Sequence, residues 1–149
     1  MVELEAIKDT VQNVAEAIAA VLDLDVSIID RSYVRLGATG QYAPELYSKA
    51  ARDSLFDHIL KTGRPGFIED AGSSVLCQRC EGRATCRELS TLGQPIFCHG
   101  TVVGVIGAVA FTPDQRDRLH ASSRQLMNFL SRMAGLLESK LLLVEALAE

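Results

Sequence analysis

Residues 94–111, QPIFCHGTVVGVIGAVAF, form the stretch of sequence that decides the fold. Apolar and β-branched residues predict two strands, 94–98 and 101–111, and the His99-Gly100 pair between them predicts a tight turn. Gly104 and Gly107 lie inside the second strand, where the missing side chains allow another part of the chain to approach closely. The stretch therefore predicts a hairpin, the local unit of an antiparallel sheet.

Helical and extended patterns lead up to this hairpin. Apolar residues at steps of three and four predict an amphipathic helix over about residues 3–22. Alternation and β-branched residues predict strands at 24–30 and 33–36, joined by a short turn. After a glycine-rich loop, the pattern predicts a helix over 46–60 and a short strand at 66–69.

The segment after the hairpin is predicted to be one long helix. Thr112-Pro113-Asp114 combines a hydroxyl N-cap, a proline at the first helical position and an acid, and the helical period continues to about residue 148. Strands joined by hairpins and flanked by helices indicate an α+β domain, with helices packed on a mostly antiparallel sheet. We therefore expect a single domain over 1–149, with helices at 1–22 and 113–148 around a sheet core at 23–112.

Composition narrows the function classes. With 149 residues and 48% hydrophobic content, the chain has the size and apolar content of one globular domain. A net charge of -4 disfavours a nucleic-acid-binding surface. The first residues are acidic, unlike a signal peptide, and the longest apolar run, 141–144, is too short to span a bilayer. We therefore expect a cytoplasmic protein without direct contact to a membrane or nucleic acid, and its cysteines should be reduced there.

Four cysteines are the residues best suited to chemistry. Cys77, Cys80 and Cys86 lie within ten residues of an irregular segment, 72–93, and Cys98 follows at the hairpin. Two intervening residues in Cys-x-x-Cys let both sulfurs face one ion, and thiolates are ligands of zinc and of iron–sulfur clusters. The spacing indicates a metal centre, and the alternatives are an iron–sulfur cluster, a zinc ion and a metal-free thiol pair or redox disulfide.

Several motifs together resemble one family. In chain order they are Leu60-Lys61-Thr62-Gly63-Arg64-Pro65, Ile68-Glu69-Asp70-Ala71-Gly72, the three-cysteine segment and Val103-Gly104-Val105-Ile106-Gly107. With these motifs the chain resembles, over about residues 25–140, the N-terminal GAF-like sensor domain of sigma-54-dependent, NtrC-type transcriptional regulators. The resemblance implies a GAF/PAS-like fold and a sensory function, and it favours an iron–sulfur cluster over zinc.

One position departs from the family pattern. The family places a cysteine directly before the Pro-Ile pair, where this sequence has Gln94. Because a strand advances ~3.3 Å per residue, Cys98 is expected ~13 Å from that position. The resemblance implies Cys77, Cys80 and Cys86 as ligands of the metal, and it leaves Cys98, His99 or an external ligand for the fourth place.

The predicted C-terminal helix suggests a partner. About 35 residues at ~1.5 Å each give ~50 Å, which exceeds the diameter of a domain of this size. Its apolar seam has the 3.5-residue spacing of a coiled coil, so we expect a homodimer through the terminal helices. In the family an ATPase domain and a DNA-binding domain follow the sensor, whereas this sequence has no Gly-x-x-x-x-Gly-Lys-Ser/Thr phosphate-binding motif.

The expected function is therefore regulatory and not enzymatic. The cysteine-bound centre would report redox or ligand state through the dimeric C-terminal helix. One alternative is a stand-alone thiol enzyme of the free methionine-sulfoxide reductase kind, and another is a small-molecule-binding GAF domain with a degenerate metal site. A GAF fold usually has a cavity between its sheet and the loops above it, which leaves room for a small-molecule ligand that the sequence does not identify.

Overall fold

The structure is a computed structural model that describes residues 2–148. Five strands form one antiparallel sheet in the order β2-β1-β5-β4-β3, with β5 at its centre. The α+β class and the predicted hairpin are confirmed. The strands are β1 (Asp25–Asp30), β2 (Arg35–Ala38), β3 (Gly66–Ile68), β4 (Ser90–Cys98) and β5 (Thr101–Ala110).

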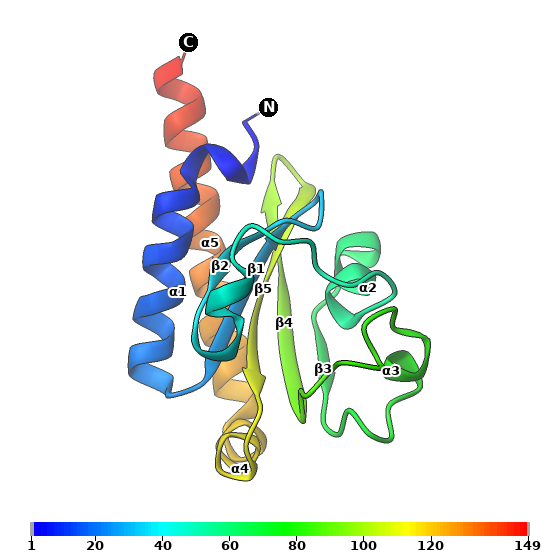
Figure 1. The fold of residues 1–149 in the computed structure, drawn as a ribbon. Coiled ribbons are helices and arrows are strands. Elements are labelled where there is room, and N and C mark those ends of the chain that lie inside the picture. The colour runs from blue at the N-terminus through cyan, green and yellow to red at the C-terminus, as the bar shows by residue number, and fades with distance from the viewer. Residues whose placement is uncertain (1, 149) are drawn as a thin grey trace.

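The helices lie on both faces of this sheet (Figure 1). α1 and α5 pack side by side on one face, and α2 packs on the other face against β3, β4 and β5. The α-helices are α1 (Lys8–Leu22), α2 (Leu55–Thr62), α3 (Val75–Arg79), α4 (Pro113–Ala121) and α5 (Ser123–Ala148). Two 3₁₀ turns, η1 (Leu4–Ile7) and η2 (Gly40–Glu45), complete the order.

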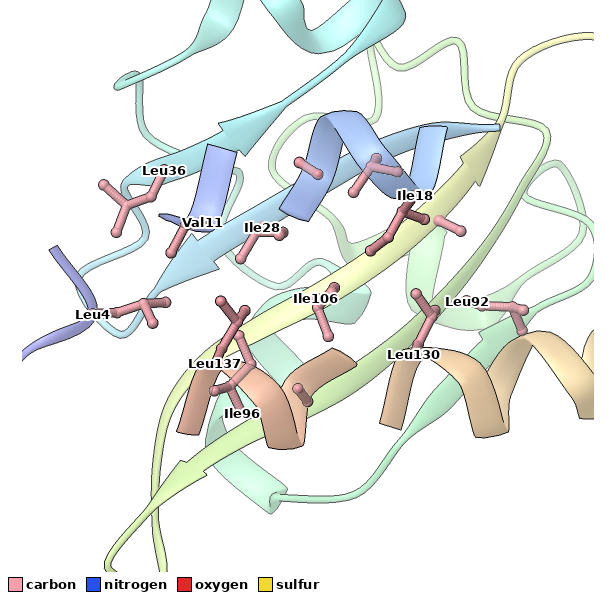
Figure 2. Close-up of a cluster of buried hydrophobic side chains, with 14 of the residues drawn as sticks. Leu4, Val11, Ile18, Ile28, Leu36, Leu92, Ile96, Ile106, Leu130 and Leu137 are labelled. Carbon is pink, nitrogen blue, oxygen red and sulfur yellow. The ribbon is translucent and has the colours of Figure 1, made fainter. Parts of the chain in front are cut away.

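The main core lies between the sheet and the α1–α5 layer. Figure 2 shows how aliphatic side chains from these helices meet the sheet. The labelled side chains are Leu4, Val11, Ile18, Ile28, Leu36, Leu92, Ile96, Ile106, Leu130 and Leu137, and each is buried. A smaller cluster on the opposite face joins α2 to the sheet through Ile29, Leu55, Phe56, Ile59, Ile68 and Val105. Each buried aliphatic side chain contributes about 1.5–3 kcal/mol, so the α1–α5 layer is the main source of stability.

Two glycines make room for α2 on its face of the sheet. Gly93 of β4 pairs with Gly107 of β5. A Cβ at Gly107 would lie 2.2 Å from Phe56 Cζ, and one at Gly93 would lie 2.6 Å from Ile59 Cδ1. The close approach predicted for Gly107 is confirmed, and its cause is the packing of α2 directly on the strand backbones.

The middle of the chain is less regular than predicted. The expected helix over 46–60 begins only at Leu55, after the N-cap Ser54. Tyr47 and Asp53 have φ values of 69° and 57°, which a right-handed helix does not accommodate. The second strand also begins later than 33, because Tyr33 has φ 70° and belongs to the turn after β1.

The segment around the cysteines is more regular than predicted. β4 already begins at Ser90, so the irregular loop expected over 72–93 is shorter. The loop also contains the short helix α3. Residues Ser90–Gly93 pair with β5 in register, and this pairing depends on a partner strand that lies later in the chain.

The predicted C-terminal helix is divided in two. Ser122, with φ -124° and ψ 23°, ends α4, and α5 follows with 26 residues. At ~1.5 Å per residue α5 is ~39 Å long, and its last turns extend past the sheet (Figure 1). Neither α5 nor any other helix within residues 2–148 is long and apolar enough to cross a bilayer.

The apolar stripe expected to form a coiled-coil seam lies largely in the core. Its leucines Leu119, Leu126, Leu130 and Leu137 are buried within the protein itself, where α4 and α5 cover the sheet. The exposed set of leucines on α5 is Leu136, Leu142, Leu143 and Leu147, of which only Leu147 belongs to that stripe. The seam therefore mainly builds the domain core, and the exposed set is the surface available to a partner.

Candidate functional site

A cavity of about 720 Å³ opens on the α2 side of the sheet. Its floor includes the sheet residues Ser27, Arg35, Thr91 and Val109. Its walls come from η2, the start of α2 and the segment that carries the cysteines. Such a volume lies within the range of ordinary small-molecule sites, so the expected cavity between the sheet and its covering loops is present.

Arg35 is the cationic group on the floor of this cavity. The side chain is buried, its Nε donates to Ser27 Oγ at 3.0 Å, and its Nη1 donates to Ser48 Oγ at 3.3 Å. The guanidinium carbon lies 4.4 Å from the centre of the Tyr42 ring. Burial lowers the pKa of Arg35, which the charges of nearby acids partly counteract, but an arginine remains protonated at any physiological pH. The cavity thus holds a fixed positive charge with N–H donors left over.

Glu88 supplies the complementary carboxyl group. Thr91 Oγ1 donates to Glu88 Oε1 at 2.6 Å, and the Tyr42 hydroxyl donates to the other carboxyl oxygen. Burial raises the pKa of Glu88, although the bond from Thr91 and the charge of Arg35 oppose that rise. Tyr42 also meets Phe111 edge-on, with ring centroids 5.5 Å apart, which fixes the orientation of its ring.

The three loop cysteines lie around the same cavity. Cys77 belongs to α3, Cys80 is the residue that ends α3, and Cys86 lies in the loop before β4; all three line the cavity. Cys77 and Cys80 are half-buried and Cys86 is exposed. Burial raises the pKa of the Cys80 thiol, and Cys86 and Cys77 raise it further, while the Gly82 N–H lowers it. Each of the four cysteines is an unpaired thiol in this structure.

The loop thiols fit a metal centre by donor type. Three soft sulfur donors around one cavity are suitable ligands for zinc or for an iron–sulfur cluster. Within residues 2–148, however, the loop cysteines are not the group of three potential ligands whose atoms all lie within 4.8 Å of one another. That group is Cys98 with His99 and Glu145. The loop thiols are therefore arranged around a common space without a closed coordination shell.

Cys98 does not join the other cysteines. It ends β4 on the side of α5, is fully buried, and belongs to the main core. At ~3.3 Å per residue, the nine residues of β4 separate Cys98 from Ser90, next to the loop, by ~26 Å. The expectation that Cys98 or its neighbour His99 provides a fourth ligand to the loop site is thereby corrected, and a fourth ligand has to come from elsewhere.

Gln94, which stands where the family has a cysteine before the Pro-Ile pair, also has its side chain directed away from the cavity. Gln94 Nε2 donates to the main-chain oxygen of Met127 in α5, at 3.2 Å. Alternate residues of a strand share one face, so Gln94 and Cys98 both face α5. The face of β4 that carries Thr91 and Gly93 is the one toward α2 and the cavity.

A second polar network anchors α2 beside the cavity. The buried Asp57 accepts from the Tyr33 hydroxyl at 2.8 Å, from the Asp53 N–H at 2.7 Å and from Lys61 Nζ at 3.2 Å. Burial alone would raise the pKa of Asp57, but these hydrogen bonds outweigh it and hold that pKa below its usual value. The sequence signal was Ser54-x-x-Asp57, the pattern of a helix N-terminus, and the structure shows Ser54 Oγ accepting from the Asp57 N–H at 3.2 Å.

The three histidines lie outside the cavity lining. His120 Nε2 lies 2.8 Å from the Glu69 oxygen and 3.2 Å from Ser90 Oγ, so it fastens α4 to the ends of β3 and β4. His58 lies on α2, and His99 lies in the hairpin turn. Sequence reasoning had assigned no role to Arg35 or Tyr42; the available signal was an arginine within an otherwise apolar strand.

Residues 6–138 match the sequence profile of the GAF domain family. Over 140 residues the chain is 31% identical to a protein of Escherichia coli strain K12 named as a uric acid sigma-54-dependent transcriptional regulator, UacR. That alignment covers 93% of this chain but only 24% of the relative, so the chain spans about a quarter of the relative's length.

Two solved structures share the fold. The GAF domain of a phosphoenolpyruvate-protein phosphotransferase from Coxiella burnetii superimposes with a TM-score of 0.70 at 12% identity, covering 99% of this chain and 88% of that one. A type II free methionine-R-sulfoxide reductase from Thermoplasma acidophilum superimposes with a TM-score of 0.63 at 13% identity, covering 91% and 92% of the two chains.

Proposed function

The chain belongs to the GAF domain family, and we propose that it is the sensory input domain of a cytoplasmic sigma-54-dependent transcriptional regulator that binds a small, planar, anionic ligand in the cavity beside β2. The observation that carries the proposal is the buried Arg35, whose guanidinium lies on the cavity floor over the ring of Tyr42. The identity to a regulator along 93% of this chain supports the regulatory class.

The ligand class follows from the groups that line the cavity. Arg35 offers charge and unused N–H donors to an anion. Glu88 offers a carboxyl group that can pair with N–H donors of the ligand, and the Tyr42 ring offers a surface on which a flat molecule can stack. A purine-like anion such as urate combines all three features, and the name of the Escherichia coli relative points to the same compound.

A binding measurement tests this proposal. We expect urate to bind the isolated domain in isothermal titration calorimetry, and Arg35→Gln to weaken that binding about 10- to 100-fold, because a hydrogen bond to a charged group contributes about 1.5–3 kcal/mol. The matched control is Arg31→Gln, since Arg31 is an exposed arginine paired with Glu3 outside the cavity. Equal affinity of the Arg35 variant and the control would refute the assigned ligand position, and no heat with urate, xanthine or other purines would refute the ligand class.

We further propose that Cys77, Cys80 and Cys86 hold a metal centre at the edge of this cavity, with an iron–sulfur cluster favoured and zinc as the alternative. The support is that three soft donors line one cavity, on a loop with few apolar anchors that a bound metal would order. A cluster would supply a redox-active centre, whereas zinc would supply a structural crosslink. Binding requires the three thiols to lose their protons and to move together, with a fourth ligand from the sensed molecule or from solvent.

Metal analysis after anaerobic purification separates these possibilities. We expect the wild-type protein to contain iron and sulfide, or zinc. The Cys80→Ala variant should lose this metal, whereas the Cys98→Ala variant should keep it at the loop, because Cys98 lies at the other end of β4. A wild-type protein that takes up no metal at the loop after anaerobic reconstitution would contradict this part of the proposal. The ligand proposal would remain testable on that metal-free protein.

A thiol enzyme is the competing reading, and it rests on the same three thiols. They line a cavity, and the Thermoplasma reductase shares the fold. Against an enzyme, the identity along 93% of this chain is to a transcriptional regulator, and we propose no enzymatic activity. Turnover of free methionine-R-sulfoxide with a thiol reductant, abolished by Cys80→Ala, would overturn that conclusion.

The regulatory proposal implies a dimer and an output. We propose that Leu136, Leu143 and Leu147 of α5 contact the same helix of a second copy, since their spacings of seven and four residues match a coiled-coil seam. α5 would then carry the state of the cavity to ATPase and DNA-binding domains of the same regulator.

A further inference from the structure

A compact group of three metal-ligand side chains lies far from the cavity. The Cys98 thiol, the His99 imidazole and the Glu145 carboxylate each offer one atom, and these atoms all lie within 4.8 Å of one another. They come from two segments that are 46 residues apart, the β4–β5 hairpin and the last turns of α5. Figure 1 shows the tip of that hairpin beside this part of α5.

The backbone holds these groups in place. His99 and Gly100 have φ values of 53° and 76°, the pair of left-handed residues that a tight two-residue hairpin turn requires. This turn directs the imidazole toward α5, where His99 Nε2 lies 2.7 Å from Glu145 Oε1. The second carboxylate oxygen accepts from the Val2 N–H at 3.4 Å, so Glu145 also has an anchor on the N-terminal segment.

Burial and charge favour a cation at this position. The Cys98 thiol is shielded from solvent, and the side chains above it, His99 and Glu145, are 53% and 26% exposed. The carboxylates of Glu145 and Glu138 place negative charge near the Cys98 thiol. A divalent cation would neutralise this negative charge and stabilise the thiolate.

We infer that Cys98, His99 and Glu145 form a binding site for a divalent transition metal of the zinc type, distinct from the loop cysteines. One sulfur, one imidazole nitrogen and one carboxylate oxygen are the three donor types of protein zinc sites, and a water completes four-coordination. Binding replaces the His99–Glu145 hydrogen bond by bonds from both groups to the metal, and the thiol proton passes to solvent. The bound metal joins the hairpin to α5 at the point where the helix leaves the sheet.

The experiment uses a protein without the loop thiols, Cys77→Ala/Cys80→Ala/Cys86→Ala, so that a loop centre cannot contribute. Titration with Co²⁺ should give one equivalent of binding with a sulfur-to-cobalt charge-transfer absorption and tetrahedral ligand-field bands, which Zn²⁺ displaces. His99→Ala and Glu145→Gln should each weaken binding at least 10-fold and leave the circular dichroism spectrum unchanged, since both side chains are at the surface.

Glu138→Gln is the matched control, because it removes a neighbouring carboxylate of the same helix that is outside the three-residue group. We expect this variant to keep the cobalt spectrum. The inference is overturned if the background protein shows no charge-transfer band, or if Glu145→Gln and Glu138→Gln bind Co²⁺ equally. Neither outcome depends on urate binding or on the loop centre, so the site stands or falls by itself.

Discussion

The Asp57 network gives the sharpest prediction for stability. Asp57 is 1% exposed and accepts three hydrogen bonds, from Tyr33, Asp53 and Lys61. Lys61 is 62% exposed and regains water when its partner is removed, so its ion pair contributes little. The other two donors are partly buried, and each lost bond to a charged acceptor costs about 1.5 kcal/mol. We expect Asp57→Ala to lower the free energy of unfolding by about 3 kcal/mol, and Asp57→Asn by about half as much.

The effect should depend on pH in a defined direction. The pKa of Asp57 is lowered in the folded protein, so the ionised carboxylate stabilises the fold at every pH above its unfolded value of about 3.9. This contribution disappears as the pH falls through the lower folded pKa. The stability gap between wild type and Asp57→Asn should therefore be constant from about pH 8 to 5 and should narrow below about pH 4.

Urea unfolding followed by far-ultraviolet circular dichroism measures this gap. Asp53→Asn is the control, because it removes a nearby carboxylate and keeps a residue type that tolerates the left-handed φ of 57°. The reasoning is refuted if Asp57→Asn is as stable as Asp53→Asn at pH 7, or if the gap to wild type is unchanged at pH 3.

Three further predictions concern the fold and the helices. Gly107→Ala should lower the free energy of unfolding by about 2–3 kcal/mol in urea, since the new Cβ would lie 2.2 Å from Phe56 Cζ. The control Gly135→Ala, whose Cβ would have nothing within 4 Å, should raise the free energy of unfolding by up to about 1 kcal/mol. Equal effects of the two substitutions would contradict the packing of α2. Thr112→Ala removes the capping box of α4 and should cost about 1 kcal/mol in the same assay. Leu143→Lys, at a position 52% exposed, should shift the protein from dimer to monomer in sedimentation equilibrium without lowering its thermal midpoint; an unchanged mass would count against the α5 interface.

The parts of the fold predicted well are those that depend on local sequence. The hairpin at residues 94–111 has its strand pattern and its turn residues within one short segment, and α4 begins at Pro113, directly after the N-cap Thr112, as the local signal indicates. The break at Ser122 was missed because the helical period runs through it: Leu119 and Leu126 are seven residues apart and both are buried. A periodic pattern predicts which side chains face the core. It does not predict a single residue, such as Ser122, whose backbone conformation interrupts the helix.

The candidate site was predicted only in part because it combines distant segments. Cys77, Cys80 and Cys86 are close in sequence, and all three line one cavity, while their role as metal ligands stays a prediction. The charged groups of that cavity are 53 residues apart, Arg35 in β2 and Glu88 before β4, and no spacing rule connects them. Cys98 shows the opposite error, since its nearness in sequence suggested a shared site, while an extended strand carries it to the far end of the sheet.

β4 connects the two sites that we propose, and this gives the domain a physical route from input to output. Its first residues adjoin the cavity, where Thr91 donates to Glu88 at 2.6 Å, and its last residue is Cys98 beside α5. On the other face of the strand, Leu92 and Ile96 pack in the core that α5 covers (Figure 2). A ligand that draws the Glu88 carboxyl group toward itself would pull on Thr91 through their hydrogen bond. The neighbouring Leu92 would then shift together with α5, because the side chains of a close-packed core move as a unit. A metal at the hairpin would hold the opposite end of β4 to the same helix. In the proposed function, ligand at one end and metal at the other would thus act on the position of one helix, and α5, whose last turns extend past the sheet, would pass this change on to an output domain.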